Sequence, residues 1–514
     1  MKVYNTLTRT KEALVPLTPG ELRMYVCGVT VYDLSHIGHA RSAIVFDVIR
    51  RYLLFKGYRV TVVKNFTDVD DRIIRRANAD GVAAREISER YIAEYQADMA
   101  SLGVRPADVE PKATEHIPQM IALIERLVAG GFAYVIDGDV YFEVRSFPAY
   151  GKLSGKNLDE LLAGARVEVD ERKRDPRDFA LWKSAKPGEP SWASPWGPGR
   201  PGWHIECSAM SMQYLGESFD LHGGGEDLIF PHHECEIAQS EAVTRKPFVK
   251  VWVHNGFVNL GATKMSKSLG NTLTIKEFAK RHDPQAIRLW LLGTHYRNPV
   301  EFAEDRMRET ARALERLQRL RVDARMFGVE PHSRSSGGMV DPWRGFRDRF
   351  EAAMDDDFNT PQALGVIFEL AHALYDRRDA ASREPQARAE FGGGVQEMVS
   401  FSNVLGLLEQ VPEMHVVSAG ETGPAPTDSG ASSLDAEAGM DALTGASLRV
   451  WVFPEMESAL RDRIGHLLVE RHDARAGKNF ARADAIRAEI RALGFVVEDI
   501  PNGVRLAPKS GPGS

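Results

Sequence analysis

RMYVCGVTVYDLSHIGHARSAIVFDVIRRYLLFKGYRVTVVKNF, residues 23–66, contains the pattern that decides the fold. Residues 23–32 are rich in β-branched and aromatic side chains, which predicts a buried strand. After a polar turn, apolar residues recur at helical spacing over 43–54, and a second apolar strand is predicted over 59–66. A strand, a helix and a strand in this order form a βαβ unit, which predicts a parallel, Rossmann-like sheet.

The same alternation resumes further along the chain, at 247–259. The region between the two halves, roughly 121–200, is therefore predicted to be an insertion. It ends in a Pro/Gly/Trp-rich loop at 187–203, for which we expect neither helix nor strand. From Pro299 onward the apolar spacing becomes helical.

Helical segments are predicted at 304–326, at 360–374, where Asn359 and a proline mark the start, and at 395–408. The small, polar and acidic stretch 416–445 predicts a flexible linker. Beyond it we expect a helical segment at 457–493 and a hairpin at 495–506. The fold class is thus predicted to be α/β with an insertion, followed by a helical bundle and a small mixed C-terminal domain.

Composition limits the class of protein. The 514 residues include 65 Lys and Arg against 72 Asp and Glu, a net charge of −7, which excludes a protein that is basic overall but permits a local basic surface. Three cysteines argue against a disulfide scaffold and for a reducing compartment. Because no run of about 18 apolar residues occurs, we expect a soluble, cytoplasmic protein that does not span a membrane.

Two histidines flank a glycine in His36-Ile37-Gly38-His39, between the first strand and its helix. A helix N-terminus offers free backbone N–H groups and a positive dipole end to a phosphate, and Gly38 allows close approach. In this context we interpret the motif as a nucleotide site, although two ordinary turn histidines are the alternative.

A second motif, Lys264-Met265-Ser266-Lys267-Ser268, places two lysines three residues apart near a glycine. Lys264 and Lys267 could contact different phosphates of one triphosphate, whereas the alternative is a solvated basic loop. Together, the HIGH-type motif and this KMSKS motif are far more specific than either alone. With both, the chain resembles the class I aminoacyl-tRNA synthetases.

Four further residues form a natural donor set for zinc: two cysteines, one imidazole and one carboxylate. They are Cys27, Cys207, His232 and Glu236, and the last two share a face if their segment is helical. No pair shows a CxxC spacing, so buried inert cysteines remain the alternative from the residues alone.

The chain resembles one family of these enzymes, the cysteinyl-tRNA synthetases, over nearly its full length. The matching stretches are MYVCGVTVYDLSHIGHAR, NFTDVDD, GRPGWHIECSAM, DLHGGGEDLIFPHHECEIAQS, KMSKSLGN and MDDDFNTPQA, beginning at residues 24, 65, 199, 220, 264 and 354.

This resemblance implies an enzyme that activates L-cysteine with ATP and Mg²⁺, releases pyrophosphate, and transfers cysteine to the 3′ end of its tRNA. It implies one Zn²⁺ per chain on Cys27, Cys207, His232 and Glu236, which binds the substrate thiolate and so rejects serine. The implied cysteine pocket consists of Thr67, Trp203 and His222. The implied catalytic residues are His36, His39, Lys264 and Lys267, and ATP binding adds Gly38, Gly224 and Asp227.

Two departures from the family pattern concern these sites. Cys235 stands where the family more often has Asn, so it is a potential competing thiolate. On a helix its side chain would point about 100° from Glu236, which favours an inert role, and by the same reasoning we expect no metal contact from His233. Arg72 and Arg75 replace lysines of a KIIK stretch, so a side activity needing a Schiff-base lysine there is not expected.

The C-terminal segment carries a local charge of +3 over 460–491, from eight basic and five acidic residues. Such a stripe is usually a solvated helix face. Its resemblance to an anticodon-binding domain points to Arg475, Phe480, Asp484 and Arg487, because exposed bases are read by stacking and edge hydrogen bonds.

The predicted organisation follows from these assignments, and we expect a monomer. The predicted regions are a catalytic first half (1–120), an insertion (121–200), a catalytic second half (201–270), a stem-contact-like connection (271–300), a helical tRNA-binding bundle (301–412), a flexible linker (413–452) and an anticodon-binding domain (453–514). Two alternatives are a ligase joining cysteine to glucosaminyl-inositol, which generally lacks a complete C-terminal module, and a catalytically silent tRNA-binding paralogue.

Overall fold

The computed structural model describes residues 1–156, 172–260, 263–264, 273–329, 342–409, 414–418, 447–451, 458–500 and 503–508. The chain divides into two compact units, Met1–Glu409 and Gln410–Ser514. No helix in this described part is long and apolar enough to cross a membrane.

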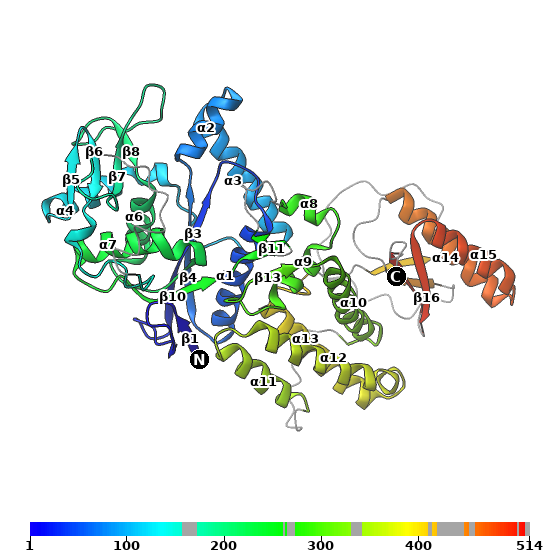
Figure 1. Ribbon diagram of the computed structural model, residues 1–514. Coiled ribbons are helices and arrows are strands. Elements are labelled where there is room, and N and C mark those ends of the chain that lie inside the picture. Colours follow the sequence, from blue (N-terminus) through cyan, green and yellow to red (C-terminus); the bar gives the residue numbers. More distant parts are fainter. Residues whose placement is uncertain are drawn as a thin grey trace, which may run out of the picture. The chain divides into compact units, whose positions relative to one another are not determined.

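A four-stranded parallel sheet forms the centre of the larger unit (Figure 1). Its strand order is β10-β9-β3-β4, and the βαβ unit predicted from the sequence is confirmed. The elements are β3 (Glu21–Thr30), α1 (Ile37–Phe55), β4 (Arg59–Thr67), β9 (Phe219–Gly225) and β10 (Val249–Asn255).

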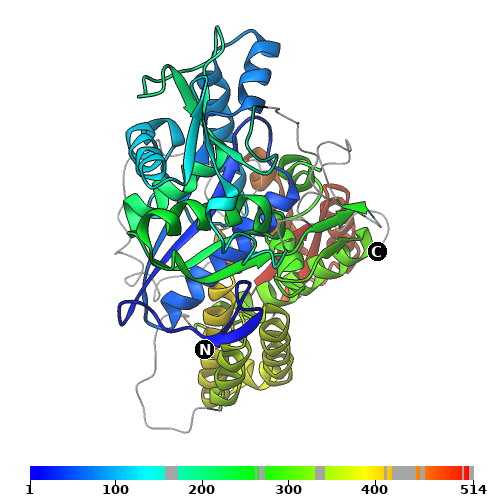
Figure 2. The same cartoon turned by 60° about the vertical axis from the view of Figure 1, so that its left-hand side comes forward.

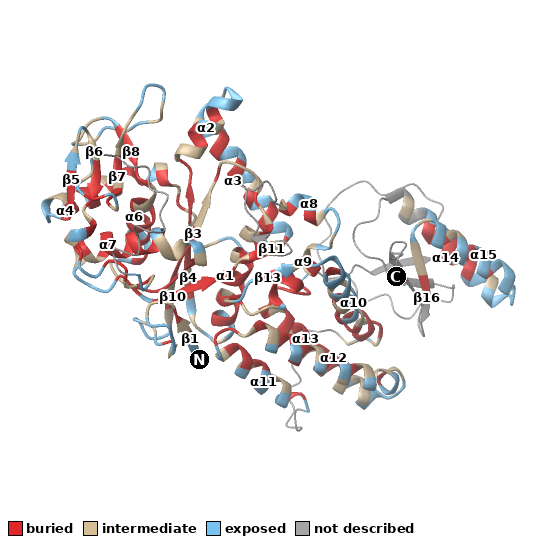
Figure 3. Cartoon of the chain, in the orientation of Figure 1, coloured by how far each residue is buried: buried red, intermediate tan, exposed pale blue. Residues whose placement is uncertain are grey.

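The two faces of this sheet are buried in separate cores, because alternate residues of a strand point to opposite faces. Met24 and Val26 of β3 join the core formed with α1, whereas Tyr25 and Cys27 join the core formed with α6. The helix α6 (Trp203–Leu215) contacts β3 and β4. Figure 3 shows how strongly these central elements are buried.

The strand predicted over 247–259 is interrupted. It ends as β10 at Asn255, and the chain continues as β11 (Val258–Leu260) in a second sheet of order β12-β11-β13, with β12 at Thr263–Lys264 and β13 at Val300–Phe302. Gly256 separates the strands. A Cβ there would lie 2.7–2.9 Å from the backbone of residues 297–298, which explains the close turn.

The remaining elements of the catalytic half surround this sheet. Strands β1 and β2 form an antiparallel hairpin at the N-terminal end, and α7 contacts both α4 and α6. The bounds are β1 (Lys2–Asn5), β2 (Thr10–Ala13), α2 (Asp71–Asp80), α3 (Ala84–Ser101), α7 (Glu234–Thr244), α8 (Ile275–Ala279) and α9 (Pro284–Leu292).

The insertion is an antiparallel sheet of order β5-β6-β7-β8 beside α4. Its elements are α4 (Ile117–Ala129), β5 (Ala133–Ile136), β6 (Asp139–Phe142), β7 (Phe179–Ser184) and β8 (Gly199–Pro201). The expectation that 187–203 holds no regular structure was wrong at its end, because β8 pairs with β7 there and Trp203 begins α6. Residues 157–171 of the expected insertion lie outside the described part.

A helical bundle completes the larger unit, and its helices α11–α13 lie side by side (Figure 1, Figure 2). The helix predicted at 304–326 is confirmed by its bounds, and Asn359 caps α12 by accepting from the backbone N–H of Gln362 at 3.2 Å. The helices are α10 (Glu304–Met326), α11 (Arg344–Asp355), α12 (Thr360–Arg383) and α13 (Pro385–Val404), the last beginning and ending earlier than predicted.

The described residues of the smaller unit form two helices and a four-stranded sheet of order β14-β15-β17-β16. The predicted hairpin is confirmed as an antiparallel β16–β17 pair, and the predicted helical segment is two helices. Two strands lie inside the expected linker 413–452, whose other residues are outside the described part. The elements are β14 (Met414–Ser418), β15 (Ser447–Trp451), α14 (Ser458–Ala476), α15 (Phe480–Ala492), β16 (Phe495–Ile500) and β17 (Gly503–Pro508).

Candidate active site

A bulge in β3 positions the first candidate ligand, Cys27. The pairing of β3 with β4 shifts register between Val26 and Val29, and the N–H of Gly28 donates to Asn65 Oδ1 at 2.9 Å. A Cβ on Gly28 would lie 1.5 Å from the carbonyl oxygen of Asn65, so only glycine permits this approach. Asn65 Oδ1 also accepts from Cys207 Sγ at 3.6 Å and thus links Cys207 to the backbone that follows Cys27.

The four predicted metal ligands come together beneath the sheet. Cys207 projects from α6, Glu236 from the first turn of α7, and His232 from a short kinked turn, Ile229–His233, that precedes α7. Cys27 Sγ lies 3.6 Å from Cys207 Sγ and 3.4 Å from Glu236 Oε1, and His232 Nε2 lies 3.2 Å from the same oxygen. All four are buried, and their ligand atoms lie within 4.8 Å of one another.

Burial dominates the electrostatics of this group. It raises the pKa of the Cys27 thiol well above the ordinary value, with Cys207 adding to the effect, and lowers the pKa of His232 to about 3. Burial also acts to raise the pKa of Glu236, but its electrostatic interaction and hydrogen bond with His222, together with its interaction with His232, hold it below its usual value. The group therefore combines thiols and a neutral imidazole with an ionised carboxylate, a set suited to a cation.

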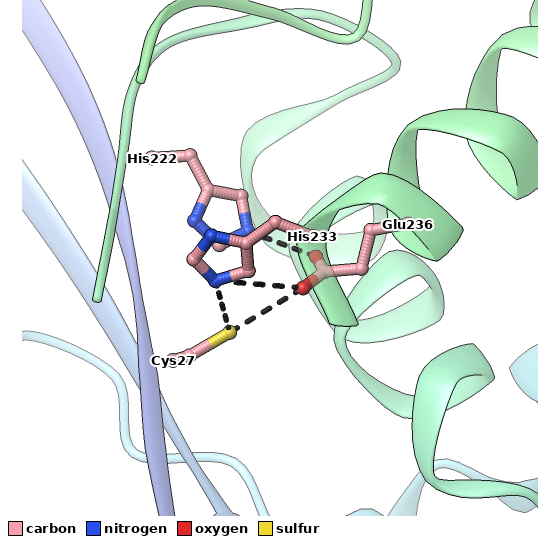
Figure 4. A group of neighbouring side chains, drawn as sticks. All are labelled: Cys27, His222, His233 and Glu236. Carbon is pink, nitrogen blue, oxygen red and sulfur yellow. Dashed lines mark hydrogen bonds and ion pairs between the residues drawn. The ribbon is translucent and has the colours of Figure 1, made fainter. Parts of the chain in front are cut away.

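A second donor group shares two residues with the first (Figure 4). It consists of Cys27, His222, His233 and Glu236. His222 Nε2 lies 2.8 Å from Glu236 Oε2, and His233 Nε2 lies 3.3 Å from Cys27 Sγ. His233 was expected to make no metal contact because its side chain would point away from the group. Its side chain in fact faces the group, because His233 precedes Glu236 by three residues and shares its side of the helix start, whereas the absence of a metal contact stays a prediction.

Cys235 belongs to neither group. Its Sγ lies 3.3 Å from Tyr150 Oη, on another side of the same helix turn, and it is buried. Its expected role as a bystander agrees with this geometry.

A cavity of about 420 Å³ opens beside the donor group and includes Cys27 in its lining. Of the three expected pocket residues, Trp203 lines this cavity and stacks on His232 with ring centroids 4.3 Å apart. Thr67 and His222 do not line it. Thr67 Oγ1 instead donates to Glu206 Oε2 at 2.7 Å, and His222 is fully buried against Trp252, so both stand behind the lining.

The HIGH-type motif lies in the same cavity, at the start of α1. His36 is the N-cap, and its Nδ1 accepts from the N–H of Gly38 at 3.1 Å. The rings of His36 and His39 stack with centroids 3.8 Å apart, and both line the cavity with Gly38 and Asp227. The KMSKS motif lies almost wholly outside the described residues.

Two other predicted nucleotide residues behave differently. Gly224 does not line the cavity, and a Cβ there would lie 2.8 Å from Leu228 and 3.0 Å from His233, so it is needed for packing. Lys264 belongs to β12, where only its backbone pairing with Asn259 is described, and Lys267 lies outside the described part.

Sequence reasoning missed several residues of this cavity. Arg72 lines it with its guanidinium over the rings of Tyr32 and Trp203, at 5.2 and 5.9 Å, and Lys64 and Tyr95 also line it. Arg72 directly follows the stretch NFTDVDD, and this position was the sequence signal that could have identified it as a cavity residue. No comparable sequence signal marks Tyr95.

The four expected anticodon residues lie in the smaller unit and are all exposed. Phe480 is the first residue of α15 and is 60% exposed, an unusual placement for an aromatic ring. Arg475 lies in the last turn of α14, whereas Asp484 and Arg487 lie on α15.

Three family models match the chain. Residues 13–312 match the tRNA synthetases class I (C) catalytic domain, residues 349–409 the DALR domain, and residues 457–505 the Cysteinyl-tRNA ligase anticodon binding domain.

Curated relatives match over almost the full length. The chain is 50% identical over 511 residues to a cysteine–tRNA ligase of Geobacter sulfurreducens, covering 98% of each chain. It is 48% identical over 517 residues to one of Syntrophobacter fumaroxidans, covering 98% of this chain and 99% of the relative. Among solved structures, methionyl-tRNA synthetase of Mycobacterium tuberculosis with methionyl-adenylate matches with a TM-score of 0.54 at 15% identity, covering 75% and 89%, which supports the fold alone.

Proposed function

The chain belongs to the cysteine–tRNA ligases, a family of class I tRNA synthetases, and on this premise we propose that Cys27, Cys207, His232 and Glu236 hold one zinc ion that selects substrate cysteine. The observation that carries the proposal is the convergence of these four donor atoms within 4.8 Å, with Cys27 in the lining of the cavity that also contains the HIGH-type motif.

The donor set fits zinc better than other common cations. Two sulfurs, an imidazole and one carboxylate match its preferred four-coordinate sites, whereas Mg²⁺ and Ca²⁺ take oxygen ligands. Burial raises the pKa of the Cys27 thiol, so a metal that binds there would have to displace the thiol proton. When bound, zinc prefers a thiolate to a neutral hydroxyl, which favours cysteine over the nearly isosteric serine.

The nucleotide half of the site is proposed to bind ATP with Mg²⁺. The start of α1 directs the positive end of the helix dipole into the cavity, and His36, Gly38 and His39 line it there. Asp227, also in the lining, is suited to the ribose hydroxyls. Lys264 and Lys267 are proposed to approach the β- and γ-phosphates.

The proposed reaction has two steps, and neither needs a protein nucleophile. The carboxylate of cysteine bonds to the α-phosphorus of ATP while the bond to the bridging oxygen breaks, so that pyrophosphate leaves with the electron pair. A ribose hydroxyl at the tRNA 3′ end then attacks the carbonyl carbon, loses its proton and releases AMP. His36 and His39 stabilise charge at the α-phosphate, so catalysis comes from positioning and electrostatics.

The aromatic lining contributes orientation. Trp203 lies between the cavity and His232, so its ring holds that imidazole in place while it presents an apolar wall to the amino acid. The hydroxyl of Thr67 is committed to Glu206, and His222 is committed to Glu236. We propose that both residues fix the floor of the pocket from behind.

The C-terminal unit supports tRNA as the acceptor rather than an amino-sugar. Residues 457–505 match an anticodon-binding domain, and a ligase for glucosaminyl-inositol has no use for one. We propose that Phe480, Arg475, Asp484 and Arg487 read anticodon bases, and that the enzyme works as a cytoplasmic monomer. Three buried free cysteines suit a reducing compartment.

The proposal is tested by cysteine-dependent ATP–pyrophosphate exchange and by tRNA charging, both measured on metal-replete, metal-stripped and zinc-restored protein. We expect exchange to fall with metal removal and to return with zinc, and transcribed cysteine tRNA to be charged. Exchange that is indifferent to metal would contradict the zinc assignment. Ligation of cysteine to glucosaminyl-inositol without tRNA charging would favour the alternative ligase.

A further inference from the structure

A hydrogen-bonded chain leads from Cys27 to the N-terminal segment of the protein. His233 Nε2 lies 3.3 Å from Cys27 Sγ, and His233 Nδ1 lies 2.8 Å from His254 Nε2. His254 Nδ1 in turn lies 2.8 Å from Thr6 Oγ1. Both imidazoles are buried, with His233 fully enclosed, whereas Thr6 is partly accessible.

Each of the four ring nitrogens of His233 and His254 takes part in one of these hydrogen bonds. A neutral imidazole has one N–H and one acceptor nitrogen, so the direction of one hydrogen bond fixes the direction of the next. Burial lowers the pKa of His254 to about 3, which keeps that ring neutral near pH 7. Only two arrangements are then possible, with the hydrogens pointing either toward Cys27 or toward Thr6.

A metal on Cys27 selects between them, because a sulfur that binds a metal carries no hydrogen to donate. The hydrogen between His233 and the sulfur must then come from His233 Nε2. His233 Nδ1 consequently accepts from His254 Nε2, and His254 Nδ1 accepts the hydroxyl hydrogen of Thr6. The hydroxyl group satisfies this role, since it can rotate to donate.

We propose that Thr6, His254 and His233 are positioning residues that direct an N–H donor onto the Cys27 sulfur and so tune the metal site. This inference rests on the proposed zinc site and goes beyond its four ligands. A hydrogen bond to a thiolate reduces the charge that the sulfur gives to the metal, and partners of this kind fix ligand orientation. The metal then attracts a further thiolate, that of substrate cysteine, more strongly.

The fold supports this role for the three residues. Thr6 follows β1 and its N–H donates to the carbonyl oxygen of Trp252 at 2.9 Å, so its position relative to β10 is fixed. His254 is the penultimate residue of β10, and His233 ends the short turn before α7. Three separate segments therefore contribute to one series of hydrogen bonds that ends at the Cys27 sulfur.

The test uses the full chain with Co²⁺ in place of zinc, because the thiolate-to-cobalt charge-transfer band reports the electron density on sulfur. His254→Phe keeps a ring but removes both nitrogens, and Thr6→Val removes only the hydroxyl. We expect both to move the band to longer wavelength, His254→Phe more strongly, and Thr6→Ser to restore it. We also expect zinc affinity, from competition with a chelator, to fall about tenfold for His254→Phe.

The matched control is His116→Phe, which replaces another buried histidine that has both nitrogens hydrogen-bonded, to Lys112 O and Tyr214 Oη. Its band should stay at the wild-type position. The inference would be overturned if the charge-transfer band of His254→Phe and Thr6→Val lay at the same position as in this control. It would also be overturned if two imidazoles coordinated the cobalt, because His233 would then be a ligand. Absence of any thiolate band in the wild type would instead refute the zinc site itself. If His254→Phe fails to fold, the comparison of Thr6→Val with Thr6→Ser tests the inference.

Discussion

Replacing Gly28 by alanine should disrupt the metal site from a position that contacts no metal. The added Cβ would lie 1.5 Å from the carbonyl oxygen of Asn65, and real Cβ contacts essentially never fall below 3.0 Å, so β3 and β4 must separate locally by about 1.5 Å. The partly buried hydrogen bond from Gly28 to Asn65 Oδ1 would be lost. Overpacking and the lost bond together predict a destabilisation of about 3–5 kcal/mol.

The shift also displaces Cys27, whose distance to zinc must hold within about 0.2 Å. We therefore expect zinc affinity to fall more than about 100-fold, measured by chelator competition, and cysteine-dependent pyrophosphate exchange to fall with it.

The matched control is Gly365→Ala within α12, where a Cβ meets nothing within 4 Å. This change should stabilise the helix by about 0.5–1 kcal/mol and leave zinc binding unchanged. Wild-type zinc affinity in Gly28→Ala, with unaltered resistance to denaturant, would refute the reasoning about the bulge.

Three further predictions test other parts of the account. Cys235→Ala should cost about 1 kcal/mol of stability but keep one zinc per chain, because its sulfur faces Tyr150; loss of zinc by elemental analysis would make Cys235 a ligand. Asp98 has a pKa raised to about 6, chiefly by burial, so its ionised form opposes folding above that pH. Asp98→Asn should therefore raise the unfolding free energy by up to about 3 kcal/mol at pH 8, and the gain should shrink between pH 6 and pH 4; a gain that does not depend on pH would contradict this. Phe480→Ala should raise the KM for tRNA by about 5- to 150-fold without changing pyrophosphate exchange, since stacking on one base contributes about 1–3 kcal/mol; unchanged charging kinetics would remove Phe480 from the anticodon contacts.

The βαβ unit could be predicted from the sequence because the apolar residues of its strands and of its helix show clear spacing and lie close together along the chain. The same applies to α10 and to the cap at Asn359, where local chemistry decides the outcome. The break between β10 and β11 was missed, because the close approach to residues 297–298 that turns the chain at Gly256 leaves no local signal.

The four proposed metal ligands were predicted through motif resemblance, and the structure brings them together beside β3, α6 and α7. Their supporting residues could not be identified in that way. His254 and Thr6 reach the site only through tertiary structure, and the direction of the His233 side chain was predicted wrongly because its segment was treated as one regular helix. Thr67 and His222 were placed in the pocket lining, whereas their side chains are hydrogen-bonded to Glu206 and Glu236, behind the residues that line the cavity.

X-ray absorption at the zinc edge tests the central claim, that the metal selects cysteine through its thiolate. The proposed ligand set predicts two zinc–sulfur bonds of about 2.3 Å in the free protein, from Cys27 and Cys207. Saturating cysteine should raise the count to three sulfurs, and saturating serine should leave it at two. A sulfur count that does not change on cysteine binding would contradict the account.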